Sequence, residues 1–372
     1  MKILFIGYSS SIHVQRYVNY FKNKGHDIAL FSFERNYDRN NYGFKMFQPF
    51  IPIFNIGFPF IKKLITSFLI KYYIKKFKPD IIHAYDLKLY GNAAALCRER
   101  PLLLSLVGSD ILIHSQRPLT KIFCKHSVNF ADYMIASSKD IKKTALLLNP
   151  NSKKISVNYI GINFDDYLPE SVDKNELRKE LGLIEDSIII LCTRGFGIIY
   201  GQIYQIWALR EIVKKHPNIQ YVFAGEGETL EIIKKQVIKF KLEKNVKFVG
   251  WLSKKNLAKY LRAADIYVST TLSDAISLST MEAMYNKLPV VVFNVGGVQE
   301  WIENNKNGFL IKKKDVKQLS RILLNLIEDE KLRLRVGIQA KKIVELKGNF
   351  KKNTDKIEQI YFKLFNHVKK YR

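Results

Sequence analysis

The sequence predicts an α/β protein with two doubly wound, parallel-sheet domains. Its 372 residues exceed the usual size of a single domain. Each half opens with an apolar run, a small loop and a helical pattern, first at Lys2–Gly7 and again at Ile188–Thr193. Apolar runs then alternate with helical patterns through both halves, which is typical of parallel strands joined by helices.

The first half is predicted to contain six strands, each followed by a polar loop. The expected strands are Lys2–Gly7, Ile28–Phe33, Asp80–Tyr85, Leu102–Val107, Tyr133–Ser137 and Ile155–Ile160. Apolar residues at helical spacing predict helices over Ile12–Lys24, over Phe58–Lys78 and from Lys139 onward. The chain lacks a full GxGxxG fingerprint and a GxxxxGK[ST] loop, so neither a dinucleotide oxidoreductase nor a P-loop enzyme is indicated.

The second half repeats the alternation after a charged, Pro-containing linker, Asp165–Asn175. Its expected strands are Ile188–Thr193, Ile219–Ala224, Val246–Gly250, Asp265–Val268, Pro289–Phe293 and Phe309–Ile311. Its expected helices are Lys174–Leu181, one from Gln202, Leu257–Ala264, one through Leu278–Met284, one containing Glu300–Ile302, Val316–Glu328, Glu330–Val344 and Asn353–Lys369. We therefore place the first domain at residues 1–163 and the second at 164–352.

The composition favours a soluble, basic, intracellular protein. Lys and Arg number 61 against 34 Asp and Glu, a net charge of +27, which favours a nucleotide diphosphate, an acidic lipid surface or nucleic acid as partner. Cys97, Cys124 and Cys192 fit neither a zinc site nor a disulfide framework, which indicates buried thiols in the cytoplasm. The N-terminal run turns polar at once, so we expect a first strand rather than a signal peptide.

The stretch from Ser269 to Ile302 carries the clearest functional pattern. Asp274 is expected in a loop, Ser277 or Ser279 at the cap of the next helix, and Glu282 about one turn into that helix. The free N–H groups of a helix start bind anions such as phosphate. Acids on either side of such a site can bind the hydroxyl groups at the two ends of a nucleotide-sugar. The alternative is that Asp274 only caps the helix and Glu282 is solvated.

This stretch resembles the donor-binding signature of retaining glycosyltransferases of family 4, which have the GT-B fold. The signature is an acid, seven residues, a Glu, small residues, Pro-Val and a Gly-Gly turn. Here it is formed by Asp274, Glu282-Ala283-Met284, Pro289-Val290, Gly296-Gly297 and Glu300. The first acid is usually Glu and is Asp in this chain. The resemblance implies an acceptor-binding domain and a donor-binding domain facing each other across a cleft, with helix 353–372 packing back on the first domain.

The resemblance also implies roles for the second domain. Glu282 would bind the ribose, Asp274 the donor sugar, and Arg194 the departing diphosphate, where charge develops during transfer. The remaining donor contacts would come from loop amides and a glycine turn, at Gly225, Gly227, Trp251, Leu252, Ala275, Ile276, Ser277 and Leu278. Tyr200 replaces a Lys of the family, so a phenol that donates one hydrogen bond stands where a charge is usual.

Acceptor-side candidates lie at strand ends and in the loops after them in the first domain. They are His13, Arg16, His83, Asp86, Ser109 and Asp110. Gly108-Ser109-Asp110 resembles a cleft-facing segment of the family, but Val107 replaces its usual histidine. Either His13 or His83 could take the role of that histidine. The alternative for His13 and Arg16 is that they lie on a surface face of their helix. The alternative for His83 is that it is buried and hydrogen bonded. No metal site of the Asp-x-Asp type is present, and no cofactor beyond the nucleotide-sugar co-substrate is implied.

The segment Phe58–Lys78 combines aromatic and apolar residues at helical spacing with six lysines. A basic, aromatic amphipathic helix of this kind is typical of an element that lies on an anionic membrane surface. Each Lys near such a surface contributes roughly 1 kcal/mol. The alternative is an ordinary sheet-covering helix whose lysines point into water.

Together these features predict a retaining glycosyltransferase. We expect it to move a hexose or N-acetylhexosamine from a nucleotide-sugar, UDP-linked rather than GDP-linked, to a glycan acceptor. A lipid-linked glycan in surface polysaccharide or glycoprotein glycan assembly is the expected acceptor. The alternatives are a nucleotide-sugar epimerase, a phosphorylase, or a degenerate basic protein that binds acidic lipid or nucleic acid, although no RNA- or DNA-binding module is recognisable.

Overall fold

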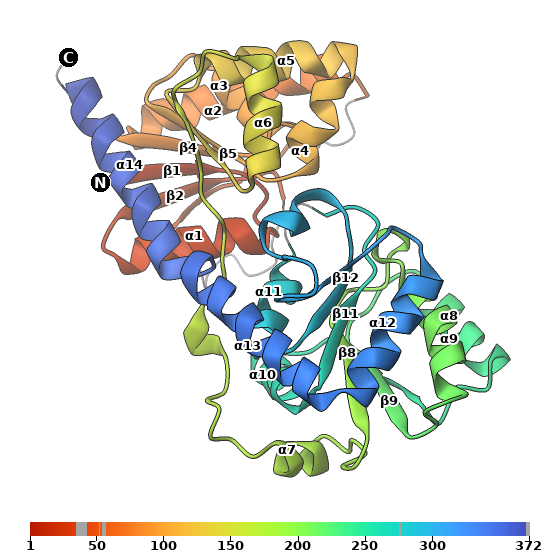
Figure 1. Ribbon diagram of the computed structural model, residues 1–372. Coiled ribbons are helices and arrows are strands. Elements are labelled where there is room, and N and C mark those ends of the chain that lie inside the picture. The colour runs from red at the N-terminus through yellow and green to blue at the C-terminus, as the bar shows by residue number, and fades with distance from the viewer. Residues whose placement is uncertain (35–42, 52, 54–56, 275–276, 370–372) are drawn as a thin grey trace. The chain divides into compact units, whose positions relative to one another are not determined.

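The computed structural model describes residues 1–34, 43–51, 53, 57–274 and 277–369 (Figure 1). The chain divides into two compact units, the first made of Met1–Ile160 and Lys352–Arg372 and the second of Gly161–Lys351. Each unit is a parallel sheet with helices on its faces, so the predicted class of two Rossmann-like domains is confirmed. The units divide after Ile160, whereas the sequence placed the boundary after Asn163.

The first unit contains a seven-stranded parallel sheet with the order β3-β2-β1-β4-β5-β6-β7. Its strands are β1 (Lys2–Ile6), β2 (Asp27–Phe31), β3 (Lys45–Phe47), β4 (Ile81–Tyr85), β5 (Leu102–Leu106), β6 (Tyr133–Ala136) and β7 (Ile155–Val157). The central strands β4 and β5 are buried along their whole length. Strands of this kind need helices on both faces, and the chain supplies them.

The α-helices of the first unit follow the alternation expected from the sequence. They are α1 (Ile12–Asn23), α2 (Pro59–Phe77), α3 (Tyr90–Leu96), α4 (Ser109–Leu112), α5 (Pro118–Phe130), α6 (Lys139–Leu148) and α14 (Phe350–Lys369). In α1 the buried residues Val14, Tyr17, Val18 and Phe21 recur at helical spacing and form one face.

The last helix, α14, packs on α1 and β4 of the first unit. Tyr361 is fully buried, with its ring centroid 5.0 Å from that of Phe21. At the edge of this contact Lys24 pairs with Asp355 and, at 2.8 Å, with Glu358. The chain therefore returns to its first domain after completing the second.

The second unit contains a six-stranded parallel sheet with the order β10-β9-β8-β11-β12-β13. Its strands are β8 (Ile188–Cys192), β9 (Ile219–Phe223), β10 (Val246–Phe248), β11 (Ile266–Ser269), β12 (Val290–Phe293) and β13 (Phe309–Ile311). Its α-helices are α7 (Lys174–Glu180), α8 (Gln202–Val213), α9 (Leu230–Lys239), α10 (Lys254–Ala263), α11 (Leu278–Tyr285), α12 (Val316–Glu328) and α13 (Glu330–Lys347). Pairing of β8 with both β9 and β11 puts these three strands at the centre of the unit.

The sequence missed five of these elements and misjudged a further segment. Strand β3 and helices α3, α4, α5 and α9 were not predicted. Helix α3 is buried on nearly every side and has no polar face, so the amphipathic pattern that marks other helices is absent. The helix predicted through Trp301 and Ile302 is wrong, because a short 3₁₀-helix covers Gly296–Glu300 and ends before Trp301.

Candidate functional site: the loops after β8, β9 and β11

The donor-side residues lie in three loops at the carboxyl ends of neighbouring parallel strands. Arg194 follows β8, Gly225 and Gly227 follow β9, and Asp274 follows β11. Because β8 pairs with both of the other strands, these loops leave the sheet side by side at one edge. Ligands of open α/β sheets bind at this edge.

The Arg194 guanidinium is the centre of this group of loops. Its Nη2 donates to Asp274 Oδ2 at 3.0 Å, and its Nη1 donates to Ser277 Oγ at 3.1 Å and to Ser279 Oγ at 3.4 Å. The Arg194 and Asp274 side chains are 17% and 16% exposed, so the ion pair is mostly desolvated yet open to a ligand. Within the described part of the chain, Nε of Arg194 is buried without a hydrogen-bond partner.

Tyr200 contacts the same guanidinium through its ring. The Arg194 Cζ lies 4.5 Å from the Tyr200 ring centroid, which is cation–π geometry. Tyr200 is held in a 3₁₀-helix, Ile198–Tyr200, just before α8. Gln202, the first residue of α8, donates from Nε2 to the carbonyl of Gly195 at 2.7 Å and to that of Arg194 at 3.3 Å. The aromatic ring and the Gln202 amide therefore fix both the side chain and the backbone of Arg194.

Helix α11 begins where the sequence predicted. Ser277 is its N-cap, and its Oγ accepts from the Thr280 amide at 3.2 Å. Glu282 lies one turn into the helix and is half-buried. Leu278 is the first residue of the helix, whereas Ala275 and Ile276 lie outside the described residues. Because the Ser277 and Ser279 side chains contact Arg194, the start of α11 lies beside the Arg194–Asp274 pair.

The glycine turn after β9 supports the Arg194 loop through close backbone contact. Gly225 and Gly227 have φ values of 134° and 148°, a region that favours glycine. A Cβ at Gly227 would lie 2.2 Å from the Phe196 carbonyl, and one at Gly225 would lie 2.9 Å from the Arg194 carbonyl. The Gly225 amide donates to Gly250 at 2.7 Å, beside Trp251 and Leu252. Side chains at either glycine would displace the loop that carries Arg194.

The structure places His83, one of the acceptor-side candidates, in the core of the first unit. The ring is fully buried, its Nε2 lies 2.7 Å from Ser105 Oγ, and its Nδ1 is hydrogen bonded to the Tyr361 hydroxyl. Burial lowers the pKa of His83 to about 3. A neutral ring with both nitrogens engaged in the core agrees with the alternative of a buried, hydrogen-bonded His83 rather than with an acceptor contact.

Asp86 and Asp110 hold the loops after β4 and β5 through backbone amides. Asp86 Oδ1 accepts from the Lys88 amide at 2.7 Å, and Asp110 Oδ1 accepts from the Gly108 amide at 2.6 Å. Asp110 Oδ2 accepts from the Leu87 amide at 3.0 Å and thereby links the two loops. Both carboxylates are more than nine-tenths buried, and among the described residues Asp86 Oδ2 has no hydrogen-bond partner. The contacts seen for these carboxylates therefore hold the two loops, and an acceptor role for Asp86 and Asp110 stays a prediction.

Electrostatics sets these two carboxyl groups apart from ordinary acids. Burial and, to a smaller extent, the neighbouring Asp110 together raise the pKa of Asp86 to about 7. The pKa of Asp110 is also raised by burial, while amides of its own loop oppose the shift.

The other acceptor-side candidates lie near the start of α1 and at α4. Within the described residues, His13 Nδ1 is buried without a hydrogen-bond partner, and burial together with Arg16 lowers its pKa to about 4. Arg16 is half-buried one turn later in α1. Ser109 opens α4, and the structure describes its backbone only. An acceptor role for His13, Arg16 and Ser109 stays a prediction.

Three further residues at the donor-side edge were not singled out as contacts in the sequence. Ser279 bonds Arg194, Gln202 holds the Arg194 loop, and Thr270 Oγ1 donates to the Gly201 carbonyl at 2.8 Å. Ser279 alone carried a sequence signal, as a possible helix cap beside Ser277. Gln202 and Thr270 are common residue types, and only the fold brings them to this edge.

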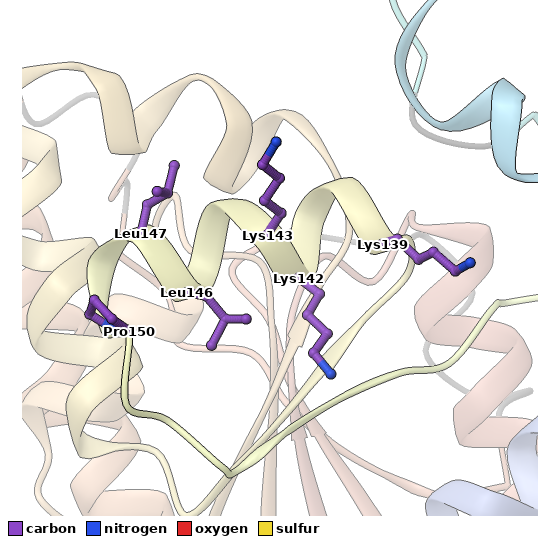
Figure 2. Close-up of a pocket in the computed structure, with 6 residues that line it drawn as sticks. All are labelled: Lys139, Lys142, Lys143, Leu146, Leu147 and Pro150. Atoms are coloured by element: carbon purple, nitrogen blue, oxygen red, sulfur yellow. The ribbon is translucent and has the colours of Figure 1, made fainter.

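Other features of the described chain lie apart from these loops. A pocket on α6 is lined by Lys139, Lys142, Lys143, Leu146, Leu147 and Pro150, whose side chains point in several directions (Figure 2). All three cysteines are buried and free. Within the described ranges, no group of three or more His, Cys, Asp or Glu is arranged to hold a metal, and no helix has the length and apolarity to cross a membrane.

Comparison with known proteins identifies the family. Residues 173–343 match the family described as Glycosyl transferases group 1, and residues 2–138 match Glycosyl transferase 4-like. The two matches span the core of both units. The chain belongs to these glycosyltransferases of the GT-B fold, as the sequence predicted.

Individual relatives agree with this assignment. The Escherichia coli UDP-Gal:alpha-D-GlcNAc-diphosphoundecaprenol alpha-1,3-galactosyltransferase is 25% identical over 325 residues, which cover 84% of this chain and 82% of the relative. Sucrose-phosphate synthase from Thermosynechococcus elongatus superposes with a TM-score of 0.82 at 19% identity, covering 99% and 100% of the two chains. Anabaena HepE in complex with UDP has a TM-score of 0.80 at 21% identity, covering 98% and 100%. The solved structures share the fold.

The buried Asp86 predicts a specific pH dependence of stability. Its pKa rises from 3.8 in a free carboxyl group to about 7 in the folded protein. Between these two pH values the folded state keeps a proton on Asp86 that the unfolded state releases. The free energy of unfolding therefore falls as the pH rises, by at most about 1.4 kcal/mol per pH unit for this group. Asp86→Asn should lack this loss in urea unfolding between pH 4 and 7.

The control for this measurement is Asp140→Asn, which removes an exposed carboxylate of the same unit. Its unfolding free energy should follow that of the wild type with pH. If Asp86→Asn and the wild type gave parallel profiles, the buried, protonated state of Asp86 would be contradicted.

Proposed function

We propose that this protein is a retaining glycosyltransferase that uses a UDP-sugar as donor. The observation that supports this proposal is the position of Arg194, held between Asp274, Ser277 and the Tyr200 ring at the carboxyl edge of the second sheet. A cation fixed at this edge, beside the amides of a helix start, is suited to bind a diphosphate.

The donor would lie across the loops after β8 and β11. Glu282, one turn into α11, would accept hydrogen bonds from the ribose hydroxyls. The diphosphate would take the Nη atoms of Arg194, together with the first amides of α11. Asp274 would then accept hydrogen bonds from the hydroxyls of the donor sugar. On binding, the Arg194–Asp274 ion pair would be replaced by two contacts with the donor, one between Arg194 and the diphosphate and one between Asp274 and the sugar.

Transfer would break the bond between the anomeric carbon and the β-phosphate oxygen. Negative charge develops on the departing diphosphate, where Arg194 and the α11 amides stabilise it without reorganisation. The acceptor hydroxyl would attack from the face that the phosphate leaves, and its proton would pass to a phosphate oxygen. The configuration at the anomeric carbon is retained, and neither a protein nucleophile nor a metal ion is needed.

The choice of donor and acceptor is supported by the relatives. The name of the Escherichia coli enzyme specifies UDP-Gal and a diphosphoundecaprenol-linked acceptor, and HepE was solved with UDP. We therefore propose a hexose or N-acetylhexosamine from UDP and a lipid-linked glycan in surface polysaccharide assembly. A nucleotide-sugar donor and three free cysteines suit an enzyme in the cytoplasm, at the membrane's inner face.

A ligand-binding test of this donor site uses Glu282→Ala. UDP at about 100 times its dissociation constant should stabilise the wild type by roughly 2.7 kcal/mol. The variant should lose this thermal shift and sugar transfer, because the ribose contact is missing, while its melting temperature without ligand is unchanged.

The matched control is Glu303→Ala, which removes an exposed acid of the same unit that pairs with Lys306. This control should keep the full UDP shift. Normal transfer in Glu282→Ala would contradict the donor site. Release of an epimerised nucleotide-sugar without an acceptor would instead indicate an epimerase.

Tyr200 allows the ring and the hydroxyl to be tested separately. If the ring positions Arg194, Tyr200→Phe should keep normal kinetics, whereas Tyr200→Ala should lower kcat/KM by about 2- to 30-fold, from the usual range of cation–π energies. The ratio of UDP to UMP affinity should fall in Tyr200→Ala only, because Arg194 acts on the diphosphate. An equal loss in both variants would show that the hydroxyl, not the ring, is used.

A further inference from the structure

Helix α2 exposes a stripe of large apolar side chains. Phe60, Leu64, Phe68 and Tyr72 follow each other at intervals of four residues and are 53%, 44%, 74% and 55% exposed. Residues at this spacing lie on one side of a helix. The buried side of α2 is mixed in polarity and contains Lys63, Thr66, Ser67, Ile70, Ile74 and Phe77. The helix therefore leaves a row of large apolar side chains uncovered.

Helix α5 continues this apolar surface. Leu119 and Ile122 are 79% and 67% exposed, and the Phe60 ring centroid on α2 lies 5.8 Å from that of Phe123 on α5. Lys63 lies beneath the junction, with its ammonium 4.5 Å from the Phe123 ring centroid. Lys63 is one of the six lysines of Phe58–Lys78, and because it is buried it faces neither a membrane surface nor water, contrary to the expectation from the sequence. We call the exposed residues Phe60, Leu64, Phe68, Tyr72, Leu119 and Ile122 the α2–α5 surface.

Positive charge surrounds this surface. The sequence of α2 contains five lysines and that of α5 contains two, and neither helix contains an Asp or Glu. Lys75 and Lys76 are exposed near the end of α2, and Lys121 and Lys125 are exposed on α5. Large apolar side chains beside exposed lysines complement a lipid surface, whose headgroups are anionic and whose interior is apolar.

We propose that the α2–α5 surface docks on an anionic lipid bilayer. Phe60, Phe68, Leu119 and their neighbours enter the boundary between headgroups and acyl chains, and the lysines contact the headgroup phosphates. Large exposed apolar patches mark interaction sites, and the charge of this one selects an anionic bilayer over a neutral partner. Docking rests on the proposed function in one respect, since it would bring the enzyme to a lipid-linked acceptor. Binding of the α2–α5 surface to a bilayer does not itself require the transfer reaction.

Vesicle flotation with the full chain tests this proposal. The wild type should float with vesicles of phosphatidylglycerol and phosphatidylcholine, bind pure phosphatidylcholine at least tenfold more weakly, and lose binding as salt rises. Leu64→Ser/Phe68→Ser should lower the binding to anionic vesicles at least tenfold. Lys75→Glu/Lys76→Glu should lower it by a similar factor and flatten the salt dependence.

Ile238→Ser/Leu346→Ser is the matched control, since both side chains are well exposed but lie in the second unit. This control should float as the wild type does. The thermal shift with UDP should be unchanged in all variants, which separates a failure of docking from a failure of the donor site. Equal flotation of Leu64→Ser/Phe68→Ser and the wild type, or no flotation of the wild type, would overturn the proposal, as would equal binding to neutral vesicles.

Discussion

The parallel direction of the strands in the second unit is the constraint on which the candidate site depends. Because β8 pairs in parallel with β9 and β11, the loops after these strands leave the sheet at one edge. Residues 80 positions apart, Arg194 and Asp274, therefore meet at 3.0 Å. The glycine turn after β9 supports the Arg194 loop from the third strand. No local motif could assemble these groups without the sheet.

The ion pair at this edge is a binding element rather than a source of stability. A partly buried pair costs desolvation energy that its attraction only partly offsets, so its value for folding is small. Its value for binding is that one ligand can engage both side chains at once: the diphosphate would take the place of Asp274 beside Arg194, and a sugar hydroxyl would take the place of Arg194 beside Asp274. The aromatic ring of Tyr200 keeps Arg194 in place without a second positive charge, whereas the family's usual Lys would add one.

Much of this architecture could be predicted because parallel strands and their helices leave strong local patterns. The predicted strands of both sheets lie within a few residues of the observed ones, and Ser277 caps α11 as expected. What these patterns could not show is tertiary in origin. His83 is hydrogen bonded to Tyr361, far away in the chain, and Lys63 is buried against an aromatic ring of α5. Such contacts override the local preference of a polar residue for water.

The central claim is that Arg194 binds the diphosphate of the donor. The most direct measurement is calorimetric titration of UDP and UMP into the wild type and Arg194→Gln. The account predicts that the wild type prefers UDP by at least tenfold and that this preference disappears in the variant, because only UDP carries the second phosphate. An unchanged preference in Arg194→Gln would show that the diphosphate binds elsewhere and would contradict the account.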